Sequence, residues 1–95
     1  MTETVPEILR SGAETYEDRQ KVYGANYKHF GTMMAGFFPN GLSIDADDEE
    51  SFNRLGLVLN CITKLARYCH DIKTGHRDSA HDLMVFAAML KEVTP

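Results

Sequence analysis

The sequence predicts an all-α fold, a compact bundle of about four helices with short connections. Apolar residues recur three and four positions apart in four segments, which glycine, proline or polar turns separate. No segment shows the apolar–polar alternation or the hairpin turn that is typical of strands. A length of 95 residues predicts one helical domain over residues 1–95. Because so short a chain has a limited core, we expect self-association, as a homodimer or higher oligomer, to complete the bundle.

The first two helices are predicted from their end signals. The first is expected over about residues 5–22, because Thr4 and Glu7 have the spacing of a capping box. A second helical period begins near Asn26 and stops at the proline–glycine turn at 39–41.

The second half of the chain predicts two longer helices. Residues 42–51 are the most polar stretch, and their acidic cluster favours a helix start over a calcium loop, because the alternating oxygen ligands and mid-loop glycine of such a loop are absent. The segment 52–69 is apolar nearly all round, which is typical of the buried centre of a fold. The last helix is expected to begin near Asp78 or Ser79.

Composition narrows the classes of partner and the compartment. The net charge of −4 gives no electrostatic reason to expect nucleic-acid binding. Cys61 and Cys69 lie eight residues apart, too far for a disulfide on one helix, so we expect reduced thiols in a cytoplasmic protein. No apolar run is long enough to span a membrane, and the first residues lack the pattern of a signal peptide. We therefore expect no membrane partner.

A polar stripe interrupts the apolar segment at 52–69. Asn60, Lys64 and Arg67 are spaced four and three residues apart, so they share one face of a helix. An unpaired buried cation is too costly, so the two cations must reach solvent or find acidic partners. This stripe is the first candidate site.

The last helix offers those partners. Asp78 and Asp82 are one turn apart and His81 lies beside them. If the last two helices pack antiparallel, Arg67 lies near both carboxylates, and together with Lys64 the cluster can hold a phosphate group directly or through a metal. The alternative is structural: Asp78 is the N-cap, Asp82 complements the helix dipole, and Arg67 forms a salt bridge that joins two helices.

Several short motifs follow one another along the chain. They are Arg19-Gln20-Lys21-Val22-Tyr23-Gly24, then Phe30, then Lys64-Leu65-Ala66-Arg67, then Arg77-Asp78-Ser79-Ala80-His81-Asp82. Their order resembles a phage and prophage family of unknown function over about Ile8 to Leu90. The arrangement is more remotely similar to the MazG-like all-α nucleotide pyrophosphohydrolases, which use helical carboxylates to hold magnesium on a nucleoside triphosphate. Ser79 departs from the asparagine usual in the phage family, and the two acidic pairs of the MazG-like enzymes are only approximated here.

The resemblance and the polar cluster together imply a nucleotide-phosphate binding protein of phage origin. Tyr23 can stack on a base, or it can be a packed residue at a helix end that Gly24 terminates. The expected ligand-binding residues are Tyr23, Asn60, Lys64, Arg67 and His81, and the expected ligands for Mg²⁺ or Mn²⁺ are Asp78, Asp82, Glu14 and Asp18.

Two questions of function stay open at this point. The nucleotide-binding protein can be a pyrophosphohydrolase or a nucleotide sponge that binds without turnover. The alternative is a small phage-encoded interaction protein that binds and modulates a protein of the bacterial host, because the acidic segment at 45–50 can contact a basic partner.

Overall fold

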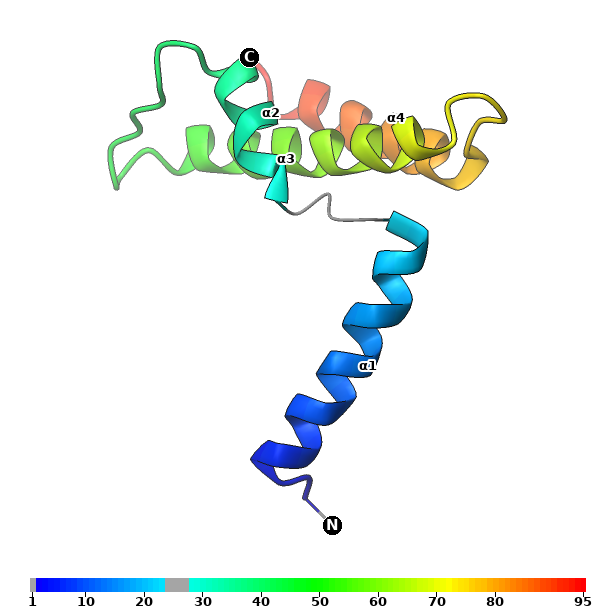
Figure 1. Cartoon of the computed structure of the whole chain (residues 1–95). Coiled ribbons are helices and arrows are strands. Elements are labelled where there is room, and N and C mark those ends of the chain that lie inside the picture. The colour runs from blue at the N-terminus through cyan, green and yellow to red at the C-terminus, as the bar shows by residue number, and fades with distance from the viewer. Residues whose placement is uncertain (1, 24–27) are drawn as a thin grey trace. The chain divides into compact units, whose positions relative to one another are not determined.

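The chain folds into α-helices, as the sequence predicts. The structure, a computed structural model, describes residues 2–23 and 28–95, and for residues 22 and 23 it describes the backbone only. These ranges contain four helices and no strand: α1 (Val5–Tyr23), α2 (Phe30–Phe37), α3 (Glu49–His70) and α4 (Arg77–Glu92) (Figure 1). None of the described helices combines the length and apolar character that crossing a bilayer requires.

The chain divides into two compact units, Met1–Gly36 and Phe37–Pro95. In the first, the predicted capping box begins α1: the Thr4 N–H donates to Glu7 Oε2 (3.0 Å), and the Glu7 N–H donates to Thr4 Oγ1 (3.4 Å). Every side chain of α1 from Val5 to Lys21 is exposed. The prediction of one domain over the whole chain stays a prediction.

Helix α2 is short and has no buried residue. Its predicted start near Asn26 lies outside the described residues, which resume at Lys28. The predicted turn follows the end of α2; in it the Gly41 N–H donates to the Phe38 carbonyl (2.9 Å), and Gly41 adopts a φ of 79°. Glycine adopts that left-handed conformation without the steric cost that a side chain brings.

The acidic stretch begins α3, so the helix-start interpretation of residues 42–51 is confirmed. Asp48 is the N-cap, and its Oδ1 accepts a hydrogen bond from the Ser51 N–H (3.1 Å). Glu49 and Glu50 occupy the first turn, where negative charge complements the helix dipole. Hydrogen bonds from the side chain and then the backbone of Ser51 lower the pKa of Asp48, and the nearby Arg54 charge lowers it further.

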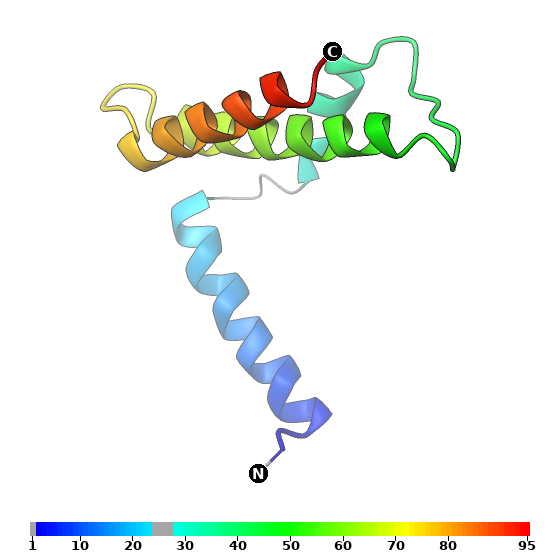
Figure 2. The ribbon, with the colours of Figure 1, turned by 180° about the vertical axis from the view of Figure 1, so that it is seen from behind.

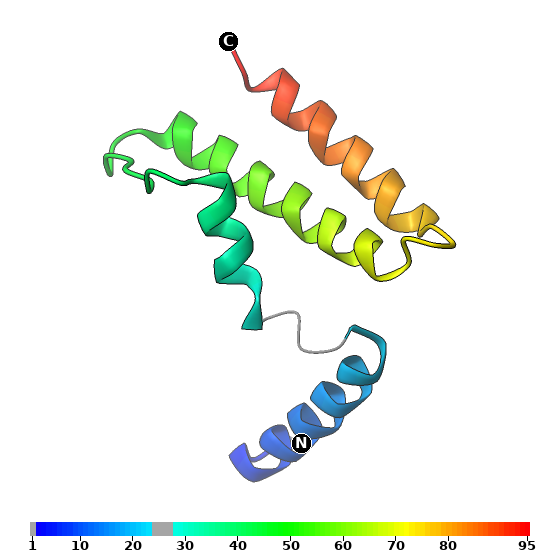
Figure 3. The same cartoon turned by 45° about the horizontal axis from the view of Figure 1, so that its top comes forward.

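Helices α3 and α4 lie side by side and antiparallel in the second unit (Figures 1 and 3). At their open end, Arg54 Nη1 donates to the Val93 carbonyl (3.4 Å) and so joins the start of α3 to the end of α4. The expectation that α3 is buried on most faces is wrong. Among the described residues Ile62 is the one buried apolar side chain, whereas Phe52 is 46% and Leu65 42% exposed. One helix, α4, covers too narrow an arc of α3 to bury the rest.

A tight turn closes the other end of the hairpin. The Asp71 N–H donates to the Tyr68 carbonyl (3.0 Å), and Gly75 adopts a φ of 81°. A Cβ at position 75 would lie 3.1 Å from Tyr68 Oη. The left-handed backbone conformation therefore favours glycine here, and a larger residue would also have to push the Tyr68 hydroxyl aside.

Helix α4 begins at Arg77, and its N-cap is His76. The His76 Nδ1 accepts from the Ser79 N–H (3.3 Å) and lies 2.6 Å from Ser79 Oγ. Ser79 is only 2% exposed, so this contact satisfies the buried hydroxyl. The alternative in which Asp78 is the N-cap is wrong, because Asp78 lies within the first turn of α4.

We predict that His76→Ala lowers the free energy of unfolding by about 1 kcal/mol, the usual cost of a lost N-cap. His76→Asn should restore most of the loss, because Asn Oδ1 can accept from the Ser79 N–H in place of the imidazole nitrogen. Urea denaturation followed by circular dichroism measures both. Equal stabilities of the alanine and asparagine variants would show that the hydrogen bond does not stabilise α4.

Candidate functional site

The antiparallel hairpin brings the polar stripe of α3 to the first turns of α4. Lys64 lies two turns before the end of α3 and Asp82 lies in the second turn of α4, so the short turn between the helices places them opposite one another. The two helices also lie side by side when seen from behind (Figure 2). The predicted meeting of α3 cations with an α4 carboxylate is present.

The contact is an ion pair of Lys64 with Asp82. Lys64 Nζ lies 2.9 Å from Asp82 Oδ2, and the two side chains are 17% and 47% exposed. The hydrogen bond from Lys64 lowers the pKa of Asp82; burial opposes this, and the charges of Lys64, His81 and Arg67 lower it further. Since the lysine is largely shielded from water, the carboxylate supplies the partner that its buried charge needs.

Arg67 and His81 lie near this pair. Both are exposed, and the charge of each acts on the Asp82 carboxylate. The charge of Arg67 acts on Asp82, and Lys64 makes the direct ion pair with it. Asn60 is exposed one turn before Lys64 on α3. The structure therefore brings Lys64 to Asp82, and the charges of Arg67 and His81 also act on that carboxylate.

The four carboxylates expected to bind a metal lie in different units. Asp78 and Asp82 belong to the second unit; Glu14 and Asp18 belong to the first, where Asp18 Oδ1 lies 3.9 Å from Lys21 Nζ. Among the residues that the structure describes, no three His, Cys, Asp or Glu side chains gather as metal ligands do. The side chain of Tyr23, the expected base-stacking residue, lies outside the described part of the chain.

The sequence analysis missed an apolar pocket of about 300 Å³ beside the acidic segment. The segment before α3 contributes one wall and the first three turns of α3 the other. Leu42 and Ile44, which stand in an otherwise polar stretch, were the available signal. The lining residues are Phe38, Leu42, Ser43, Ile44, Ser51, Arg54, Leu55 and Val58.

The segment between the two walls of this pocket, which we call the acidic rim, contains residues 45–50. Residues 45–50 contain five carboxylates, and all are exposed. Asp48 caps α3. The other four (Asp45, Asp47, Glu49 and Glu50) have no ion-pair partner among the described residues. Arg54, the cation that lines the pocket, donates to Ser51 Oγ (3.2 Å) and to the Val93 carbonyl.

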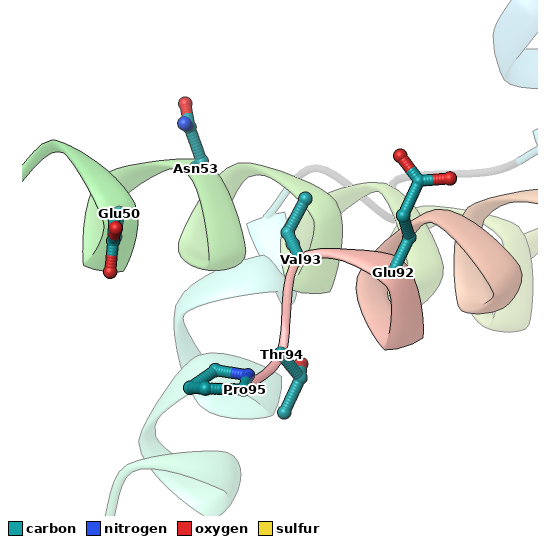
Figure 4. A pocket seen from close by; sticks show the side chains of 6 residues that line it. All are labelled: Glu50, Asn53, Glu92, Val93, Thr94 and Pro95. Carbon is teal, nitrogen blue, oxygen red and sulfur yellow. The ribbon is translucent and has the colours of Figure 1, made fainter.

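A second pocket, of about 370 Å³, lies at the open end of the hairpin (Figure 4). Its lining residues are Glu50, Asn53, Glu92, Val93, Thr94 and Pro95. The carboxylates of Glu50 and Glu92 lie well apart in Figure 4, so they do not form a pair that could hold a cation between them.

Comparisons with known proteins assign no role to the residues of the site. No family model, curated protein or solved structure matches the chain. The resemblance to the phage family and to the MazG-like enzymes stays a prediction.

We predict that Lys64→Met returns the pKa of Asp82 toward its ordinary value of 3.8, because the variant removes the hydrogen bond that lowers it. In the native protein the folded pKa lies below the unfolded one. The pair therefore stabilises the fold above the unfolded pKa, and this stabilisation is lost as pH falls through the lower folded pKa. Side-chain carboxyl chemical shifts, followed by NMR through an acid titration, measure the change.

Asp48 is the internal control for this titration. Its pKa is lowered by Ser51 and not by Lys64, so it should keep its value in the Lys64→Met variant. An unchanged pKa of Asp82 in that variant would show that the ion pair does not form in solution.

Proposed function

We propose that the chain is an interaction protein that binds a basic, apolar segment of another protein, in a bacterial host cytoplasm if the chain is of phage origin. One observation carries the proposal: the segment that joins the two walls of the apolar pocket contains four acidic side chains with no ion-pair partner among the described residues, and those residues bury only one apolar side chain. Apolar contacts supply most of the affinity of such a complex, and opposite charge at the rim speeds association and selects the partner.

The pocket is suited to an apolar anchor residue. Leu42 is 52% exposed, whereas Ile44, Leu55 and Val58 are half-buried, so an inserted side chain would contact apolar atoms on both walls. Each fully covered aliphatic side chain contributes about 1.5–3 kcal/mol. Lysine or arginine residues on either side of the anchor would then lie near Asp45 and Asp47.

The experiment measures binding of a labelled, amphipathic helical peptide of leucine and lysine by fluorescence anisotropy. The Asp45→Lys/Asp47→Lys variant should bind about tenfold more weakly, because it replaces attraction by repulsion at the rim. Asp48 is left unchanged because it caps α3. Leu42→Ser should also weaken binding, since it removes apolar contact area from the pocket.

Matched controls come from α1, whose side chains are also exposed. The Glu14→Lys/Glu17→Lys variant changes net charge by the same amount as the rim variant, and Leu9→Ser removes an exposed leucine outside the pocket. Both should bind the peptide as the native chain does. The proposal fails if rim and control variants lose affinity equally, or if the native chain does not bind the peptide.

A second candidate function, binding of a nucleotide phosphate, is favoured by the three basic side chains around Asp82. Lys64, Arg67 and His81 all act on one carboxylate, so a phosphate could compete for the same charges. Direct binding requires the phosphate to displace Asp82 from Lys64. In a MazG-like arrangement Asp82, with Asp78, would instead hold a Mg²⁺ or Mn²⁺ ion that carries the phosphate.

Asp82→Asn separates these two modes. We expect a nucleoside triphosphate to raise the melting temperature of the native chain, since a ligand that binds the folded state stabilises it. Without metal, Asp82→Asn should enlarge the shift if the phosphate binds the cations directly. With Mg²⁺ or Mn²⁺, the same variant should abolish the shift if a metal carries the phosphate.

Lys64→Gln should reduce the shift in melting temperature if the phosphate binds the cations directly. Lys73→Gln, which removes a cation in the turn, is its control. No shift with any nucleotide, with or without metal, would exclude this candidate. A pyrophosphate-release assay then separates a hydrolase from a sponge.

A further inference from the structure

Helix α4 has exposed apolar side chains on the side turned away from α3. The side that meets α3 contains the buried Ser79 and the ion-paired Asp82. On other sides of the helix, Met84 is 59%, Val85 37% and Met89 46% exposed. At 100° per residue, the outward face occupies an arc of about 100°. We call this the α4 outer face; its residues are Arg77, His81, Met84, Val85, Ala88 and Glu92.

Opposite charges stand at the two ends of this face. Arg77 begins α4, and Glu92 ends it. Both are exposed, and neither has an ion-pair partner among the described residues. A second α4 laid antiparallel, with Met84 opposite Val85 of the partner subunit, would place opposite charges together at both ends.

The pairing that results is self-complementary. Arg77 lies opposite the partner's Glu92. A two-fold axis repeats this pair, so one contact surface satisfies both copies. In a parallel arrangement Arg77 would face the partner's Arg77, and like charges in contact oppose association. The charges therefore select the antiparallel orientation.

The middle of the face permits close helix packing. Ala88 is small and lies opposite His81 of the partner subunit in this register, while the flexible Met84 side chain can fill the space between two helix backbones. Helix α4 has 16 residues, so the contact is about 24 Å long. A contact of this length belongs to the small class of protein interfaces, and the affinity should be modest.

We propose that two copies of the chain associate through the α4 outer face, antiparallel about a two-fold axis. The partner is a second copy of the chain, because the positive end of one face meets the negative end of the other in the antiparallel arrangement. This association does not rest on the proposed binding pocket, which the segment 38–44 and the start of α3 form. Glu92 also lines the pocket at the open end of the hairpin, so the association would cover part of that pocket's wall.

Sedimentation equilibrium over a range of concentrations of the full chain tests the association. We expect a reversible monomer–dimer equilibrium with a dissociation constant above about 1 μM. Met84→Lys should leave only monomer, because it places two cations at the centre of the contact. A native chain that stays monomeric at millimolar concentration would overturn the proposal, as would a variant that dimerises like the native chain.

A charge swap tests the pairing itself. Arg77→Glu alone and Glu92→Arg alone should each weaken the dimer about tenfold, and the double variant should recover most of the loss because it restores opposite charges in both pairs. Lys73→Glu, a reversal in the turn outside the face, is the control for net charge. Failure of the double variant to recover, or an equal loss in the control, would contradict the assigned register.

Disulfide trapping tests the orientation. In a Cys61→Ser/Cys69→Ser background, Met84→Cys should give a cross-linked dimer, because position 84 lies beside the two-fold axis. Arg77→Cys should give none, because two copies of position 77 would be about 22 Å apart along the axis, beyond the reach of a disulfide. Cross-linking at position 77 but not at 84 would indicate a different arrangement and would refute the antiparallel contact. If another protein were the natural occupant of this face, neither thiol would trap a dimer of the pure chain.

Discussion

The antiparallel packing of α3 on α4 is the constraint on which the second unit depends. The turn that joins them favours Gly75, because its φ of 81° is a left-handed conformation that a side chain makes costly. The next residue, His76, caps α4 and satisfies the buried hydroxyl of Ser79. Arg54 ties the other end of the hairpin to the Val93 carbonyl. Because these contacts fix both ends, the facing positions along the helices, including Lys64 and Asp82, follow from the hairpin.

This packing buries little apolar surface, and the functional proposals follow from that shortage. Among the described residues Ile62 is the one apolar side chain that is buried, although large apolar side chains occur on every helix. Surface that water must hydrate is available to a partner. The acidic rim near the apolar pocket and the opposite charges at the two ends of the α4 outer face favour different partners. The first favours a basic segment, and the second favours a copy of the same helix.

Sequence patterns predicted the parts of the fold that depend on neighbours along the chain. The capping box of Thr4 and Glu7, and the acidic start of α3, need only residues within one helical turn, and both are present. The N-cap of α4 was misassigned because histidine is an uncommon cap, and only the geometry of the turn shows that His76 can reach Ser79. The burial of α3 was overestimated because periodicity shows which residues are apolar but not how many neighbouring helices cover them.

The candidate site also separates what local sequence predicts from what helix packing decides. The sequence correctly brought cations of α3 to Asp82 of α4, because helical spacing and a short turn determine that. It could not decide whether Lys64 or Arg67 contacts Asp82, since this depends on the rotation of two helices about their axes. That choice matters for function: the shielded cation is neutralised by Asp82, while Arg67 stays at the surface. A phosphate must therefore displace a formed ion pair to reach Lys64, whereas the pocket at residues 38–58 offers a partner contacts without breaking any. This difference in cost is the physical reason for ranking protein binding above nucleotide binding.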